Sequence, residues 1–444
     1  MNARTPTRDV PRATYAARAR IVAACLATVV VLIVAIVSHA GGGGPSAGQG
    51  TTAAAARAAP PPSPKLVLDT ASRIVVAGNL PPLPWPATGQ AAIGVQGVGT
   101  IATSQSQHSV PIASVTKIMT AYLVLRDHPL SGDAGGPVLR ITEADALAFQ
   151  HDAESGDSNL DVVAGELIDE RQLLEGLLIP SADNIADLLA TWDAGSIGAF
   201  VAKMNAAAAA LGMTGTHYAD ASGLDPQTVS TARDQVLLAA AAMANPVFDS
   251  IVDNAHVVLP VSGEVWNYNP LIGVDGVVGV KSGFTSEASA CLVAAAWRTV
   301  GHTRALLIAV ALGQPNGLYG AGDADRALLD AVTPLLEVRR VVALGDQLAE
   351  AQVPWSEHAG PAVATQPADL VVWPGLSMTL SLLGRPGLTA WTKRHTPDDW
   401  VLPASTQVGD VVLTVDGSSV TTVPLDLTAD LDGPPQGWTP PRGG

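Results

Sequence analysis

The chain has 444 residues and a mass of 45.2 kDa, which is long enough for two or three domains. With 24 basic and 40 acidic residues its net charge is −16, which excludes nucleic-acid binding as a main function. Because 48% of the residues are hydrophobic and only 14% are charged, the chain is neither a disordered acidic tail nor a coiled coil. Two cysteines, Cys25 and Cys291, are too few for a disulfide framework or a thiolate metal site.

The N-terminal region predicts export. Residues 1–20 form a basic arm with a local charge of +4, which leaves −20 for the rest of the chain. The uncharged apolar run Ile21–Val37 follows, and the arginines before it place the N-terminus in the cytoplasm. We favour a retained transmembrane signal-anchor over residues 21–38, with a signal peptide cleaved at Ser38-His39-Ala40 as the alternative. We therefore expect a single-pass protein of the cell membrane with an extracytoplasmic catalytic domain.

A tether and a run of helices come next. Residues 39–64 are rich in glycine, alanine and proline and cannot bury a core, so they predict a flexible tether. Paired strands are expected at Ala91–Thr103, where short apolar runs are broken by glycines. The expected helices are Ser114–Arg126, Ala164–Leu178 with a capping box of Asp169 and Gln172, Ala182–Trp192, a helix capped by Ser196 that ends near Gly212, and one capped by Ser230 that runs to about Asn245.

Apolar runs joined by short turns follow the helices and predict an antiparallel meander. These runs are Gly276–Gly283, Ala288–Val300 and Arg304–Gly313, with a closing helix from about Ala324 to Arg339. Strands on either side of a block of helices predict an α+β catalytic domain, an antiparallel sheet flanked by helices, over residues 65–339.

The remaining chain predicts a small C-terminal β domain over residues 340–432, followed by a Pro/Gly tail at 433–444. Its short strands include Asp410–Val415 and Val420–Leu425, and Asp416-Gly417 between them is typical of a hairpin turn.

The first motif that carries chemistry is Ser114-Val115-Thr116-Lys117, at the start of a predicted helix. Positions three residues apart share a helix face, so the Lys117 amine is expected near the Ser114 hydroxyl. A serine needs an adjacent base at neutral pH, and a helix start offers free N–H groups to a developing oxyanion. Burial and a second cation would favour the neutral amine that a base requires.

Two further motifs follow in the chain. Ser181-Ala182-Asp183-Asn184 enters a helix and offers a hydroxyl for proton transfer and an amide for a substrate backbone. Lys281-Ser282-Gly283, followed by Phe284 and Thr285, ends a β-run; its cation and hydroxyls suit a carboxylate, and its glycine allows a close backbone approach. Because the chain has only five lysines, two of them within these motifs are hard to explain by chance.

In order and spacing, the three motifs match the S-x-x-K, S-x-N and K-[TS]-G set. Over roughly Leu80–Leu336 the chain resembles the low-molecular-mass penicillin-binding proteins, the serine-type D-Ala-D-Ala carboxypeptidases of the actinobacterial kind. Further matching segments are Pro111-Ile112-Ala113, Thr120-Ala121-Tyr122, Leu211-Gly212-Met213, Thr216-His217, Ser222-Gly223-Leu224, Ser230-Thr231-Ala232-Arg233-Asp234, Asn269-Pro270-Leu271 and Asp275-Gly276-Val277.

The resemblance implies a β-lactamase/transpeptidase-like fold that acts on peptidoglycan stem peptides ending in D-Ala-D-Ala, with β-lactams as covalent inhibitors. It implies no cofactor, no metal and no nucleic-acid partner. By position, it implies that Ser114 is the acyl-enzyme nucleophile, Lys117 its base and Ser181 a proton relay. It further implies a carboxylate site at Lys281, Ser282, Gly283 and Thr285, and an oxyanion hole of the backbone N–H groups of Ser114 and Phe284.

One position departs from the pattern, since Asp183 stands where the second motif has asparagine and Asn184 follows it. An ionised carboxylate accepts hydrogen bonds and cannot donate them. Either Asn184 takes over the amide role, or Asp183 changes substrate contact and rate.

Two other functions compete with the carboxypeptidase. A class A β-lactamase uses a deacylating glutamate in an E-x-x-L-N segment, but the one glutamate between the second and third motifs, Glu264, is followed by Val265-Trp266-Asn267. A catalytically weak module that binds peptidoglycan is the second rival; the retained Ser114, Lys117 and Lys281 count against it.

Overall fold

The computed structural model describes residues 61–439, apart from 106, 156–157, 386–387, 389–390 and 394–398. The basic arm, the expected anchor at 21–38 and nearly all of the tether lie outside the described residues. All described residues belong to one compact unit, Ala59–Gly444.

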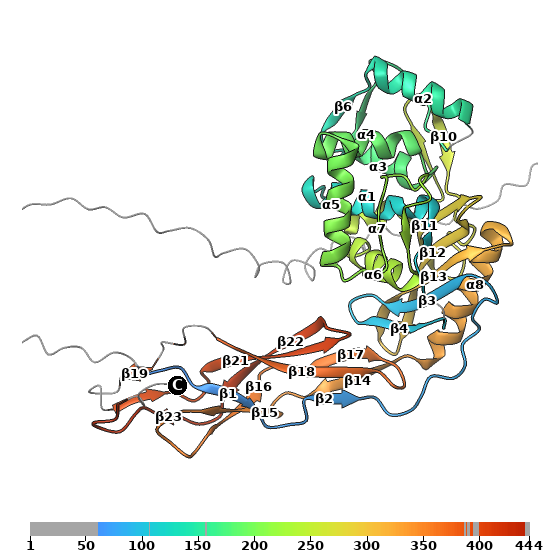
Figure 1. Cartoon of the computed structure of the whole chain (residues 1–444). Helices are drawn as coiled ribbons and strands as arrows, with labels where there is room; N and C mark the ends of the chain where they lie inside the picture. The colour runs from blue at the N-terminus through green and yellow to red at the C-terminus, as the bar shows by residue number, and fades with distance from the viewer. Residues whose placement is uncertain are drawn as a thin grey trace, which may run out of the picture. The chain divides into compact units, whose positions relative to one another are not determined.

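A five-stranded antiparallel sheet forms the centre of the catalytic part (Figure 1). Its order is β11 (Val277–Thr285), β12 (Ser289–Val300), β13 (Thr303–Gln314), β3 (Gln90–Val95) and β4 (Gly99–Thr103). The predicted meander and the predicted N-terminal strand pair are therefore confirmed, and the first and last parts of this domain meet where β3 pairs with β13.

Both faces of this sheet are buried, which explains why its strands are continuous apolar runs rather than alternating ones. Along β13, Leu306 and Ile308 belong to the same hydrophobic cluster as the helices of the middle of the chain. Their neighbours Leu307 and Ala309 belong to a second cluster together with Leu328 of α8 (Gly317–Val332). The period of two along a strand thus places helices on both faces.

The helical block between β4 and β11 contains the five expected helices in order, together with two that the sequence did not predict, Glu143–Ser155 and Pro246–Val252. Its helices are α1 (Lys117–Asp127), α2 (Glu143–Ser155), α3 (Glu170–Leu178), α4 (Asp183–Ala194), α5 (Ile197–Ala210), α6 (Ala232–Ala242) and α7 (Pro246–Val252). Three short strand pairs accompany them: β5 (Val110–Pro111) with β8 (Val229–Ser230), β6 (Val138–Arg140) with β7 (Leu167–Asp169), and β9 (His256–Leu259) with β10 (Gly263–Trp266).

Two of the predicted caps are confirmed and one shifts by a residue. The capping box of Asp169 and Gln172 is present, although it starts the helix at Glu170 rather than at 164. Ser196 caps α5 by accepting a hydrogen bond from the Ala199 N–H. Thr231, not Ser230, caps α6, because Ser230 is still part of β8.

The C-terminal part is a β domain, and the hairpin at Asp416-Gly417 joins β21 (Gln407–Val415) to β22 (Ser418–Leu427) as predicted. Its seven-stranded sheet has the order β1 (Lys65–Leu68), β15 (Gln347–Gln352), β16 (Gly360–Ala364), β22, β21, β18 (Ser377–Gly384) and β2 (Arg73–Val75). The shorter strands are β14 (Glu337–Val342), β17 (Ala368–Val372), β19 (Thr392–Lys393), β20 (Trp400–Leu402) and β23 (Leu431–Asp432).

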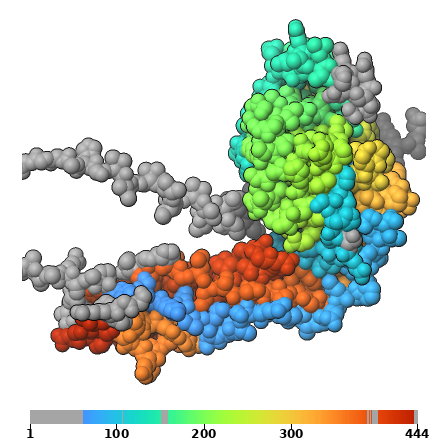
Figure 2. All heavy atoms as spheres, in the orientation of Figure 1, coloured from blue at the N-terminus to red at the C-terminus, as the bar shows by residue number. Residues whose placement is uncertain are grey.

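Two boundaries of the predicted domains need correction. β1 and β2 pair with β15 and β18, so residues 65–75 belong to the C-terminal sheet; in Figure 2 these blue residues lie along the orange strands. The helix expected to reach Arg339 ends at Val332, since a short 3-10 turn containing Pro334 follows and Glu337–Val342 pairs with β17.

Candidate active site

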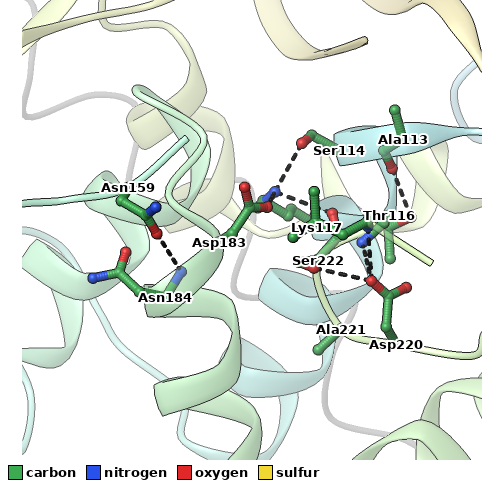
Figure 3. A network of polar contacts seen from close by, with 12 residues as sticks. Ala113, Ser114, Thr116, Lys117, Asn159, Asp183, Asn184, Asp220, Ala221 and Ser222 are labelled. Carbon is green, nitrogen blue, oxygen red and sulfur yellow. Dashed lines mark hydrogen bonds and ion pairs between the residues drawn. The ribbon is translucent and has the colours of Figure 1, made fainter. Parts of the chain in front are cut away.

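The three motifs come from separate elements of the catalytic part, and Figure 3 shows residues of the first two. Ser114 lies in a 3-10 turn, η3 (Ala113–Thr116), and Lys117 is the first residue of α1. Ser181 lies just before α4, Asp183 is the first residue of that helix, and Lys281 is on β11, an edge strand. Hydrogen bonds and charge interactions connect Ser114, Lys117, Asp183 and Lys281 in one site.

The Lys117 amine is the centre of this site, and its residue is fully buried. It lies 2.8 Å from Ser114 Oγ, 2.5 Å from Asp183 Oδ1 and 3.0 Å from the carbonyl oxygen of Ser222. An ammonium donates to all three oxygens. A neutral amine donates to Asp183 and Ser222 and turns its lone pair toward the Ser114 hydroxyl, which is the arrangement a general base needs.

Asp183 and Asn184 are separated by the geometry of α4. The Asp183 carboxylate forms the ion pair with Lys117, and its side chain is only 6% exposed. Successive helix residues differ by about 100° around the axis, and the Asn184 side chain is engaged elsewhere: Oδ1 accepts from Leu160 N at 3.0 Å and Nδ2 donates to Leu160 O at 2.9 Å. The Asn184 side chain therefore bonds to the segment at Leu160 and does not contact Lys117, and a role of Asn184 at the substrate stays a prediction.

Lys281 is the second buried cation of the site, with an exposure of 1%. Its amine donates to the carbonyl oxygen of Ser282 at 2.9 Å, and among the described residues no carboxylate forms an ion pair with it. Burial, followed by the positive charge of Lys117, holds the pKa of the Lys281 amine well below its usual range, while Asp183 acts in the opposite direction.

The strand that carries Lys281 packs directly against the nucleophile. A Cβ at Gly283 would come within 2.9 Å of Ser114 N and 3.0 Å of Val115 N, so only glycine lets β11 approach η3 this closely. Ser282 beside it is 4% exposed, and Thr285 at the end of the strand accepts a hydrogen bond from Ala288 N. Phe284 is 62% exposed at the same end.

The backbone is strained on both sides of the site. Ala113, which precedes the nucleophile, has a φ of 47°, and Ser181 has a φ of 67°, a region that residues with a Cβ rarely occupy. Such strain collects where the surrounding structure holds functional groups in place. Ser181 is 4% exposed and precedes Asp183 by two residues. The strained turn at Ser181 therefore also brings the Asp183 carboxylate to Lys117.

One participant was not assigned a role from the sequence. Ser222 was noted only as part of a matching segment, yet its carbonyl oxygen is the third partner of Lys117. Its signal was Ser222-Gly223, a pair of small residues that is typical of a backbone packing closely against another element.

Other candidates have structural surroundings. Cys291 is fully buried, as expected of a small hydrophobe, and burial raises the pKa of its thiol to about 12. Glu264 lies on β10, and its carboxylate is 3.5 Å from His256 Nε2, in a hairpin with both side chains exposed. Among the described residues, no group of three or more His, Cys, Asp or Glu side chains could hold a metal ion.

Comparisons with known proteins agree with this site. Residues 88–316 match the family model described as D-alanyl-D-alanine carboxypeptidase, peptidase S11. The chain is 33% identical over 244 residues to the D-alanyl-D-alanine carboxypeptidase DacB2 of Mycobacterium tuberculosis, an alignment covering 53% of this chain and 78% of that protein. It is 32% identical over 254 residues to a D-alanyl-D-alanine carboxypeptidase of a Streptomyces species, covering 52% of this chain and 85% of that protein.

A solved structure extends the likeness in fold. Penicillin binding protein 5 from Haemophilus influenzae matches with a TM-score of 0.59 and 20% identity, covering 80% of this chain and 100% of that one. This chain belongs to the D-alanyl-D-alanine carboxypeptidase family of serine peptidases. The predicted resemblance and the predicted class of enzyme are confirmed.

Within residues 61–439, where the structure describes the chain, no single helix has the length and apolar character needed to cross a membrane.

Proposed function

We propose that this protein removes the terminal D-alanine from peptidoglycan stem peptides through an acyl-enzyme on Ser114. The observation that carries the proposal is the buried Lys117 amine, 2.8 Å from Ser114 Oγ and fixed by two further oxygens. A base held at this distance can take the hydroxyl proton as the oxygen attacks, without moving either group.

The reaction proceeds in two halves. Ser114 Oγ attacks the carbonyl carbon between the two D-alanines, its proton passes to Lys117 Nζ, and a tetrahedral oxyanion forms. The C–N bond then breaks, and the departing amine takes a proton relayed from Lys117 through Ser181. Water attacks the resulting ester with Lys117 again as base, which restores the Ser114 hydroxyl and releases the shortened peptide.

The oxyanion is stabilised by backbone N–H groups, for which we assign Ser114 and Phe284. Ser114 lies at the start of the 3-10 turn that leads into α1, where N–H groups lack helical partners and the helix dipole favours negative charge. For the second donor we assign Phe284 because it follows Gly283 on β11, the glycine that packs against Ser114 N.

The terminal carboxylate of the substrate binds at the end of β11. Lys281 supplies the cation, and Ser282 and Thr285 supply hydroxyl groups on the same strand, whose Gly283 packs against the turn that carries Ser114. A buried amine without a carboxylate partner among the described residues gains most from an anionic ligand, because a charge-assisted hydrogen bond replaces an unfavourable desolvation.

Asp183 is the position at which this site differs from the S-x-N pattern, since an aspartate replaces the asparagine. Its Oδ1 holds Lys117, as an asparagine oxygen would, but its second oxygen accepts hydrogen bonds where an amide would donate them. An ionised Asp183 also repels an anionic substrate. We therefore expect weaker binding of the substrate carboxylate than an asparagine at this position would give.

The N-terminal segment supports a membrane location. We infer from the basic arm and the apolar run over residues 21–38 that the protein is held at the cell membrane with its catalytic part outside. A tether over residues 39–64 would let the site reach stem peptides in the wall.

The test is covalent labelling of the full-length chain with a fluorescent penicillin, in parallel with D-alanine release from a diacyl-Lys-D-Ala-D-Ala peptide. We expect one adduct on Ser114 and stoichiometric D-alanine release, and loss of both in Ser114→Ala by at least about 10³-fold. Ser109→Ala is the matched control, because Ser109 bonds to the Gly215 carbonyl and not to Lys117. An adduct without D-alanine release would favour a binding module. The absence of both the adduct and the D-alanine release would refute the assignment.

A further inference from the structure

A loop that precedes α6, residues 220–225, packs against the nucleophile and its base. The carbonyl oxygen of Ala221 accepts a hydrogen bond of 2.7 Å from Thr120 Oγ1, and that of Ser222 accepts from Lys117 Nζ. Gly223 has a φ of +92°, and a Cβ there would come within 1.9 Å of the Ala113 carbonyl oxygen. The loop therefore contacts α1 at two side chains and touches the turn that carries Ser114.

One carboxylate holds this loop in shape (Figure 3). Asp220 Oδ2 accepts from the backbone N–H groups of Gly223 and Leu224 at 2.8 Å each, and from that of Asp225 at 3.2 Å. The same oxygen accepts from Ser222 Oγ at 2.9 Å, and Oδ1 accepts from Thr228 Oγ1. A carboxylate that accepts several N–H bonds ties consecutive peptide units into one orientation.

From these contacts we propose that Asp220 is a positioning residue for catalysis: it orients the loop so that the Ser222 carbonyl holds the Lys117 amine on Ser114. This inference rests on the proposed role of Lys117 as base. Asp220 touches no reacting atom, and it acts through Ser222. Without it, the amine keeps Asp183 and Ser114 but loses the acceptor that completes its geometry.

The loop acts on the rate of the reaction through the base. The charged groups that face the Lys117 amine are Asp183 from α4 and Lys281 from β11, with Asp220 acting from the loop through Ser222. Displacing the Ser222 carbonyl should lower the acylation rate constant and leave the noncovalent affinity for the penicillin unchanged, because Ser222 contacts the base.

The test compares Asp220→Ala with Asp220→Asn in the full-length chain, measuring acylation over a range of penicillin concentrations, which separates the acylation rate constant from the noncovalent affinity. We expect Asp220→Ala to acylate about 10- to 100-fold more slowly at saturating penicillin, with an unchanged affinity, because a misplacement of about 1 Å costs this much. Asp220→Asn keeps one oxygen for the backbone N–H groups, but its amide cannot accept the hydrogen bond from Thr228 Oγ1, so we expect a smaller loss of about fivefold.

Asp225→Asn is the matched control, because Asp225 lies in the same loop but its carboxylate accepts from Gln227 N. If Asp220→Ala does not fold, Thr120→Val is the second variant, because it removes the hydrogen bond to the Ala221 carbonyl with little change of shape. Thr120→Ser retains this hydrogen bond. We expect slower acylation in Thr120→Val and not in Thr120→Ser. A folded Asp220→Ala that acylates at the wild-type rate, or that slows only through a weaker noncovalent affinity for the penicillin, would overturn the positioning role. Loss of the adduct in the wild type would instead overturn the function itself.

Discussion

The site contains two buried lysines on different kinds of element, and their surroundings differ. Lys117, at the start of α1, donates to three oxygens and forms an ion pair with Asp183. Lys281, on the edge strand β11, donates to the carbonyl of Ser282, and none of the described residues supplies it with a carboxylate. Both are at most 1% exposed, so the difference between them is in partners rather than in burial.

The difference shows how one site divides its work between two cations. The Lys117 amine has three oxygen partners because a base must keep its position while its proton leaves and returns. Lys281 lacks a carboxylate among the described residues because its anion is expected to come with the substrate. The first lysine contributes to both folding and reaction, whereas the second is costly for folding and useful only to a ligand.

Lys117→Met tests this contrast most strongly. We expect acylation of Ser114 to fall by about 10³- to 10⁴-fold, because the general base is lost. We also expect the free energy of unfolding to fall by about 2–3 kcal/mol, since a buried carboxylate loses the cation it was paired with. Penicillin acylation rates and denaturant unfolding measure the two effects separately.

Lys203→Met is the control for this variant. Lys203 forms ion pairs with Asp127 and Asp193 away from the site, and its side chain is 27% exposed. Because the Asp193 carboxylate of this pair is fully buried, we expect a loss of stability here as well, but an unchanged acylation rate. Equal effects of the two substitutions on acylation would contradict a special role of Lys117.

Lys281→Met should act in opposite directions on activity and stability. We expect kcat/KM for the D-Ala-D-Ala peptide to fall by about 10²-fold, the worth of a charge-assisted hydrogen bond to the substrate carboxylate. We expect the free energy of unfolding to rise by about 1–3 kcal/mol, because a buried amine is replaced by an apolar side chain of similar shape. An ester or amide that lacks the carboxylate should be processed by both proteins at similar rates.

The pH dependence of stability gives an independent check on Lys281. Burial lowers the pKa of this amine in the folded state, so the unfolded chain binds more protons between that pKa and about 10.4. Wild-type stability should therefore rise with pH across this window, and the rise attributable to Lys281 should vanish in Lys281→Met. If stability rose with pH equally steeply in the two proteins, the pKa of the Lys281 amine would not be lowered in the folded state.

The motifs themselves could be predicted from the sequence, because each is a local pattern. Ser114 and Lys117 are three residues apart at a helix start, and this spacing alone brings their side chains together. The capping box of Asp169 and Gln172 could also be predicted from the sequence, since both partners lie within one helical turn.

Features that depend on distant segments could not be predicted. β1 pairs with β15, in register from Lys65 with Gln352, and nothing near Lys65 indicates this partner. The choice between Asp183 and Asn184 needed the helix orientation, which the neighbouring Leu160 and Lys117 reveal. The role of Asp220 could not be predicted, because it depends on how its loop packs against α1.

Asp183→Asn should have the smallest effect, and it tests whether the charge of Asp183 matters beyond holding the Lys117 amine. Asparagine keeps an oxygen toward Lys117 but removes the negative charge 2.5 Å from it, so the amine stays in place while the repulsion of an anionic substrate is relieved. We expect kcat/KM for the D-Ala-D-Ala peptide to rise by up to about 10-fold. Asp193→Asn, the same change in the pair with Lys203, should leave kcat/KM unchanged. A kcat/KM that stays at the wild-type value, or falls, would mean that Asp183 serves only to position the amine.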